Sequence, residues 1–143
     1  MSRRQRKGQI EEEDASFLKL GEEFNSAPCV LISEVRVLLE GAKQKKLENF
    51  GTESAAVSDI MQKTLDYCSR FSKFTSKQTV KEIRGLIPIP PYHEFEAAQL
   101  ANLCCETVEE AKALIPTLSQ HDDDEVQRIL EEMHNLKKFQ IAD

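Results

Sequence analysis

Apolar residues recur every three or four positions along most of this chain, and that spacing is the strongest constraint on its fold. The clearest stretch runs from Ala55 to Lys73, where the apolar positions share one face and predict an amphipathic helix. These positions are Val57, Ile60, Met61, Leu65, Cys68 and Phe71. Shorter stretches with the same spacing lie before and after it. We therefore expect an all-α fold: a helical bundle of five or six helices with an extended N-terminal segment.

Capping residues predict where several of these helices begin. Thr75 with Gln78, and Thr107 with Glu110, match the capping box. In that motif a hydroxyl and a longer side chain satisfy free amides at a helix start. Ser33 can cap an earlier helix in a similar way. These positions predict helix starts near residues 34, 76 and 108.

The C-terminal half has equally clear boundaries. The run 88–91, which reads Pro-Ile-Pro-Pro, must end a helix, because proline has no amide hydrogen and disfavours helical angles before it. From Tyr92 to Leu103 the chain is rich in alanine and apolar on more than one face, which is typical of a central helix. Asp122 or Asp123 can cap a final helix. We expect these two helices to hold much of the core.

A length of 143 residues suits one domain of ordinary size. The first residues are polar, and their charge changes from basic to acidic, which is typical of disorder. We divide the chain into a disordered charged arm, residues 1–16, and a single helical domain, residues 17–143. Within that domain we expect an extended docking segment at 17–32, a polar surface loop at 43–54 and the main helical bundle at 55–143.

No residue pattern points to catalysis. The four cysteines include no C-x-x-C pair, and the three histidines are not spaced to complete a zinc site with them. The acidic run 122–125 lacks the spaced ligands and the glycine of a calcium loop. Nucleotide-binding and hydrolase motifs are absent, and no apolar run is long enough to cross a membrane. We expect no active site, metal, cofactor, small-molecule substrate or membrane partner.

The stretch from Lys63 to Arg84 is basic, although the formal net charge of the chain is −6. Its basic side chains include Arg70, Lys73, Lys77, Lys81 and Arg84, and three aromatic residues, Tyr67, Phe71 and Phe74, lie among them. Such a mixture is typical of proteins that bind single-stranded nucleic acid. The alternative is that the aromatic rings lie in the core while the basic residues face solvent. The helical spacing of the aromatic residues favours this second interpretation.

One long run of residues carries a family resemblance. FEAAQLANLCCETVEEAKALIPTL, from Phe95 to Leu118, resembles the C-terminal signature of the RNA polymerase II fourth-subunit family, whose archaeal counterpart is the F subunit. Shorter stretches add to it: EEDASFLKLGEEF from Glu12 to Phe24, Ser33-Glu34 leading to Leu38-Leu39-Glu40, and the spaced residues Leu65, Tyr67, Arg70, Phe71, Ser72 and Phe74. Together they span nearly the whole chain from Glu12.

The resemblance implies an HRDC-like helical bundle that pairs with the seventh subunit of RNA polymerase II in a stalk. Neither member of that pair is catalytic. The implied functions are support of transcription initiation, closure of the polymerase clamp and contact with emerging RNA. A nuclear location follows, and shuttling to the cytoplasm is compatible with it.

The sequence points to two surfaces, of which the resemblance implies the first and the run of basic residues suggests the second. The partner-subunit interface would consist of Leu18, Leu20, Gly21, Phe24, Cys29, Leu31 and Ile32. A basic face formed by Arg70, Lys73, Lys77, Lys81 and Arg84 would contact nucleic acid or the polymerase. The alternative function is a free-standing HRDC-like module that binds nucleic acid through this basic face without a polymerase.

Overall fold

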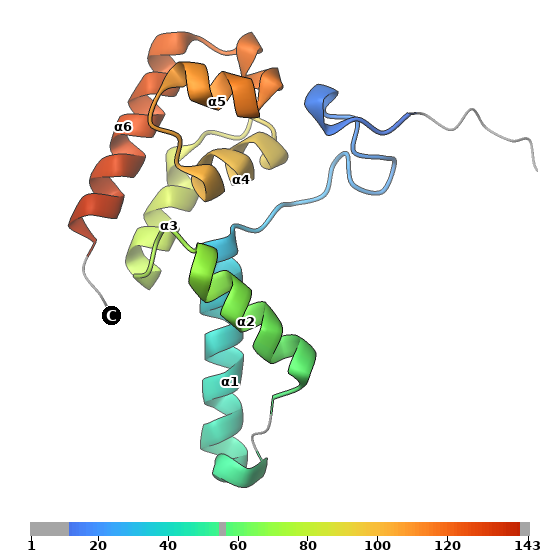
Figure 1. Ribbon diagram of the computed structural model, residues 1–143, viewed down its shortest axis with the longest axis vertical. Helices are drawn as coiled ribbons and strands as arrows, with labels where there is room; N and C mark the ends of the chain where they lie inside the picture. Colours follow the sequence, from blue (N-terminus) through green and yellow to red (C-terminus); the bar gives the residue numbers. More distant parts are fainter. Residues whose placement is uncertain (1–11, 55–56, 141–143) are drawn as a thin grey trace, which may run out of the picture.

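The computed structural model describes residues 12–54 and 57–140, and within them the chain forms six α-helices and two short 3-10 helices (Figure 1). In chain order they are η1 (Ala15–Phe17), α1 (Ile32–Ser54), α2 (Asp59–Phe71), α3 (Lys77–Leu86), α4 (Glu94–Leu103), α5 (Val108–Leu114), η2 (Pro116–Gln120) and α6 (Asp123–Phe139). The prediction of an all-α fold is confirmed. None of the helices in these residues is long and apolar enough to span a membrane.

Figure 1 shows two parts of different shape. Helices α3 to α6 gather into a compact body, whereas α1 and α2 form an antiparallel hairpin that projects from it. α1 packs along α2 and reaches the body at α3. The segment before α1 runs beside the body, where η1 lies against η2. This arrangement leaves the hairpin with solvent on several sides.

The hydrophobic core lies between the helices of the body. α4 contributes the buried alanines Ala97, Ala98 and Ala101, whose small side chains let its neighbours approach closely, and it also buries Leu100. α6 contributes the buried residues Val126, Ile129, Leu130 and Met133 from one face. The prediction that the alanine-rich stretch is a central helix is therefore confirmed.

The predicted surface loop at 43–54 is wrong, because α1 continues through these residues to Ser54. Its polar residues are mostly lysine, glutamine and glutamate, which are strong helix formers even without a buried face. Pairs four residues apart stabilise the exposed surface: Arg36 with Glu40 at 3.0 Å and Gln44 with Glu48 at 3.1 Å. Gly51, at φ 73°, interrupts the helix near its end.

The predicted capping residues are partly right. Thr107 Oγ1 accepts from the Glu110 amide at 3.1 Å, as expected. Asp122, of the two candidates, caps the last helix. Thr75 does not cap α3, because its neighbour Ser76 does so through the Thr79 amide. Ser33 is also not a cap: it lies inside α1, and its buried hydroxyl accepts from the Phe74 amide at 3.3 Å.

Glu96 connects the start of α4 to η2. It completes a capping box, because its Oε1 accepts from the His93 amide at 2.9 Å while His93 Nδ1 accepts from the Phe95 amide. Its second oxygen accepts from Thr117 Oγ1 at 2.8 Å. The residue is only 2% exposed. A buried carboxylate of this kind is tolerated because its oxygens have hydrogen-bond partners.

Arg84 ties the segment before α1 to the body. Its guanidinium donates to the Cys29 carbonyl at 2.6 Å and to Glu34 of α1, and its Nη1 lies 3.5 Å from Glu94 Oε2 of α4. Glu94 in turn accepts from the Cys29 amide at 3.1 Å. The hydrogen bond that Arg84 donates to Glu34 is the main reason that the pKa of Arg84 is raised above its ordinary value. Leu31, 3% exposed, adds an apolar anchor in the core.

Replacing Glu96 should destabilise the fold. The change Glu96→Ala leaves the His93 amide and the Thr117 hydroxyl without their acceptor, so we expect a loss of roughly 2–4 kcal/mol in the free energy of unfolding. Glu109→Ala removes an exposed carboxylate of α5 and should change stability by less than about 0.5 kcal/mol. Urea denaturation followed by circular dichroism measures both. Equal stability of the two variants would contradict the structural role of Glu96.

Replacing Arg84 should loosen the segment before α1. Arg84→Met keeps much of the side-chain volume but removes the hydrogen bonds, and we expect a loss of about 2 kcal/mol, since hydrogen bonds to charged groups contribute most. The matched control is Arg128→Met, which breaks an exposed pair with Glu132 and should cost about 0.5 kcal/mol or less.

Hydrogen exchange locates the effect of the Arg84 change. Faster exchange should appear at the amides of residues 29–34 in Arg84→Met but not in Arg128→Met. If exchange there is unchanged, Arg84 does not hold the segment.

Candidate interaction surfaces

The segment before α1 is irregular but locally folded. Asp14 and Lys19 exchange backbone hydrogen bonds of 2.8 and 3.0 Å around η1, which therefore begins inside the stretch expected as a disordered arm. Residues 1–11 of that arm lie outside the described residues. A turn follows at Gly21, where φ of 89° favours glycine over any residue with a side chain. His93 Nε2 lies 2.8 Å from the Asn25 carbonyl and fixes the turn to α4.

The seven residues of the predicted partner interface differ in accessibility. Phe24 is exposed, at 62%, whereas Leu31 is buried in the core of this chain and offers no free surface. The others, half-buried, are Leu18, Leu20, Gly21, Cys29 and Ile32. Two exposed apolar residues of the same segment were not in the predicted set: Phe17, 71% exposed, and Val30, 56% exposed. The sequence could have identified these two residues, because they are apolar and lie next to Leu18 and Leu31, which were in the predicted set.

A cleft of about 460 Å³ separates this segment from the turn between α3 and α4. Leu18, Ala27 and Pro90 are among the apolar residues that line it, and His121 is among the polar ones. The His121 ring stacks on Tyr92, with centroids 4.0 Å apart. Burial raises the pKa of Tyr92 to about 12. The cleft thus combines an apolar wall with polar side chains such as His93, Glu94 and His121.

The cysteines do not have the environment of activated nucleophiles. Burial raises the pKa of each thiol above its ordinary value, most clearly for Cys104, where it reaches about 11. A high pKa disfavours the thiolate, which is the reactive form. Across the described stretches no three side chains of the types His, Cys, Asp and Glu are grouped so that they could hold a metal ion.

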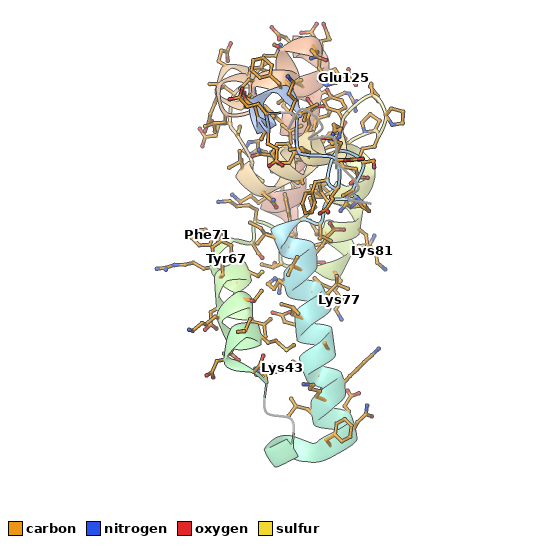
Figure 2. All side chains as sticks on the ribbon, turned by 90° about the vertical axis from the view of Figure 1, so that its right-hand side faces the viewer. Lys43, Tyr67, Phe71, Lys77, Lys81 and Glu125 are labelled. Carbon is orange, nitrogen blue, oxygen red and sulfur yellow. The ribbon has the colours of Figure 1, made fainter. Side chains whose placement is uncertain are left out.

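The five residues of the predicted basic face do not form one continuous surface. Arg84 is engaged in the contacts with Glu34, Glu94 and Cys29 described above. Figure 2 shows Lys77 and Lys81 of α3 on one side of the molecule, and Tyr67 and Phe71 of α2 on the other. Arg70 belongs to the last turn of α2, and half-buried Lys73 follows that helix. The five basic residues are close in sequence, but they do not share one face of the fold.

The three aromatic residues are also divided. Phe74 is fully buried, as the core interpretation predicted, but Tyr67 is 56% and Phe71 44% exposed. Those two rings contact each other, with centroids 4.7 Å apart and planes at 47°. The interpretation that all three lie in the core is therefore wrong for two of them. Leu65 and Cys68 already form the buried side of α2, which places Tyr67 and Phe71 on the outside.

Comparisons with known proteins cover almost all of this structure. A family model described as RNA polymerase Rpb4 matches residues 29–137. DNA-directed RNA polymerase II subunit rpb4 of Dictyostelium discoideum is 40% identical over 148 residues, with 94% of this chain and 95% of that protein covered. DNA-directed RNA polymerase II subunit 4 of Arabidopsis thaliana is 36% identical, covering 91% and 97%.

A fungal relative shows the same extent of similarity. DNA-directed RNA polymerase II subunit rpb4 of Schizosaccharomyces pombe is 38% identical over 132 residues, with 92% of this chain and 96% of that protein covered. The matched residues include the segment that Arg84 holds, the hairpin and the body. The chain therefore belongs to the RNA polymerase Rpb4 family.

Proposed function

We propose that this chain is a non-catalytic accessory subunit of DNA-directed RNA polymerase II. The observation that carries the proposal is the extent of the similarity: relatives named as this subunit align over more than nine-tenths of both chains. The alignment thus includes the surfaces as well as the core. The raised pKa values of the thiols disfavour the thiolate form and so disfavour the cysteines as nucleophiles.

The proposal includes a partner, the seventh subunit of the polymerase, bound through the segment before α1. Exposed apolar side chains there, Phe17, Phe24 and Val30, provide the kind of area that an interface removes from water. The contacts of Arg84 and His93 hold the backbone of the segment in place. A preorganised segment loses less conformational freedom on binding, which raises affinity.

Within the assembly we infer a stalk position that supports transcription initiation, clamp closure and contact with emerging RNA. An HRDC-like arrangement of the bundle and a nuclear location, with shuttling to the cytoplasm, belong to the same proposal. The alternative, a free-standing module that binds nucleic acid through its basic face, has less support. Lys77 and Lys81 lie apart from the aromatic pair, and Arg84 contacts other elements of its own chain.

The pairing is tested by charging two exposed phenylalanines. The double change Phe17→Asp and Phe24→Asp places two charges where the partner would bury apolar area, and we expect at least a hundredfold loss of the co-purified partner. The matched control is Phe139→Asp, which charges a phenylalanine that is also 71% exposed, at the end of α6. Affinity purification of the tagged full chain from nuclear extract, with mass spectrometry of the bound proteins, measures both.

The wild-type purification tests the function itself. We expect the largest polymerase subunits and the second stalk subunit to be recovered with the wild-type chain and with Phe139→Asp. Recovery of the wild-type chain without any polymerase subunit would overturn the proposed function. Full recovery with the doubly charged variant would instead overturn only the assignment of the interface.

A further inference from the structure

The outer face of α2 carries apolar side chains that nothing in the described chain covers. Ile60 is 79%, Tyr67 56% and Phe71 44% exposed. They lie seven and four residues apart, so they form one stripe along the helix, on the side away from Leu65 and Cys68. Burying the aromatic rings of this stripe in a complex would remove a large apolar area from water.

Two cations lie beside this stripe, next to the rings. Lys63 precedes Tyr67 by four residues and Arg70 follows it by three, so both side chains border the tyrosine on the helix surface. Neither forms an ion pair with another residue of the described chain.

Two exposed acidic side chains border these cations, because Asp59 precedes Lys63 by four residues and Asp66 precedes Arg70 by four. Asp66 accepts from Gln62 Nε2 at 2.9 Å. The four exposed charges of α2 therefore sum to zero, but the two cations are not held in direct ion pairs within the described residues.

We propose that Lys63, Tyr67, Arg70 and Phe71, here called the α2 platform, bind single-stranded RNA by stacking of unpaired bases on the two rings. The contact between the rings, 4.7 Å between centroids, gives neighbouring bases adjacent π surfaces. The two cations are placed to contact the phosphates that follow those bases. The assignment of RNA as the ligand rests on the proposed function, in which transcript passes close to the subunit.

The chemistry of the platform favours RNA over a second protein. A helix docked on α2 would be received by a continuous apolar groove. The position between Ile60 and Tyr67 on the stripe is instead Thr64, and the two cations lie beside it. Tyrosine, phenylalanine and arginine also occur often in protein interfaces, but lysine is depleted at their centres, and alternation of aromatic and basic residues is usual where single strands bind.

The platform differs in position from the predicted basic face. Figure 2 shows Tyr67 and Phe71 beside the junction of hairpin and body, on the side away from Lys77 and Lys81. A strand that stacks on Tyr67 and Phe71 would therefore follow α2 rather than α3. Charge changes at Lys63 and Arg70 can therefore be compared with charge changes at Lys77 and Lys81, because the two pairs belong to different sides of the molecule.

The composition of the chain gives the platform its own spectroscopic signal. There is no tryptophan, and of the two tyrosines Tyr92 is 1% exposed while Tyr67 is 56% exposed. Stacking of a base on Tyr67 should quench its emission. We expect titration of the full chain with a 12-nucleotide oligouridine to quench tyrosine emission with the same midpoint as the anisotropy of the labelled RNA. In Tyr67→Phe, binding should stay within twofold while the saturable quench disappears.

Removal of the rings tests stacking directly. The double change Tyr67→Ala and Phe71→Ala should weaken RNA binding by about 5- to 150-fold for each base that stacks. Phe139→Ala is the matched control, because Phe139 is 71% exposed and lies beside a lysine, with Lys138 Nζ 5.4 Å from its ring centroid. This control should bind within twofold of wild type. All three positions are exposed, and thermal unfolding verifies that the variants are folded.

Salt dependence tests the cations. The double change Lys63→Gln and Arg70→Gln should reduce the slope of log affinity against log salt by about 1.4, which corresponds to two phosphate contacts on a single strand. Lys77→Gln with Lys81→Gln removes the same charge from α3 and should leave the slope nearly unchanged. A larger effect of the α3 pair would overturn the location of the site.

Three other outcomes would also overturn the proposal: no binding of oligouridine by the wild-type chain, unchanged affinity after removal of both rings, or a loss of co-purified polymerase after ring removal with RNA binding intact. The last would identify a protein as the occupant of α2. In each case recovery of the polymerase with the wild-type chain still tests the proposed function separately, so the two failures are distinguishable.

Discussion

The guanidinium of Arg84 joins four parts of this chain: the segment before α1, α1, α3 and α4. It lies on α3 and binds the carbonyl of Cys29, the carboxylate of Glu34 at the start of α1 and, at longer range, Glu94 at the start of α4. Together with the hydrogen bonds from the Cys29 amide to Glu94 and from the Phe74 amide to Ser33, this side chain sets where the N-terminal segment meets the body and where the hairpin leaves it. Because the network is only partly exposed, its hydrogen bonds contribute more than those of a surface ion pair.

The fold separates two kinds of surface. The segment before α1 presents apolar side chains from a backbone that hydrogen bonds hold to the body, which suits a permanent protein contact. The hairpin buries little of itself: Leu65 and Cys68 are the buried residues of α2, and its outer face keeps two rings and two cations in solvent. The two proposed binding sites, one for a protein and one for a flexible strand, thus lie on separate parts of the chain.

Several features of the fold followed from local physical chemistry that the sequence displays. Helix spacing identified the amphipathic helices, and Thr107 and Asp122 capped their helices because short polar side chains satisfy the nearest free amides wherever the helix lies. The loop predicted at 43–54 was wrong because an exposed helix needs only good helix formers and no apolar stripe. The cap at His93 was missed because histidine rarely serves as one, although Glu96 three residues later matched the capping box.

By itself the sequence determined the all-α class, most helix positions and, through the run from Phe95 to Leu118, the family, because these depend on local spacing and on a matching order of residues. Only the tertiary structure decided which side chains are free to bind. Arg84 and Lys81 lie three residues apart on one helix, yet Glu34 and Glu94 engage the first and leave the second exposed. Phe74 and Phe71 differ as sharply, because only Phe74 lies beyond the end of α2, where the chain enters the core. Such differences arise from contacts between segments distant in sequence, which spacing along one helix does not record.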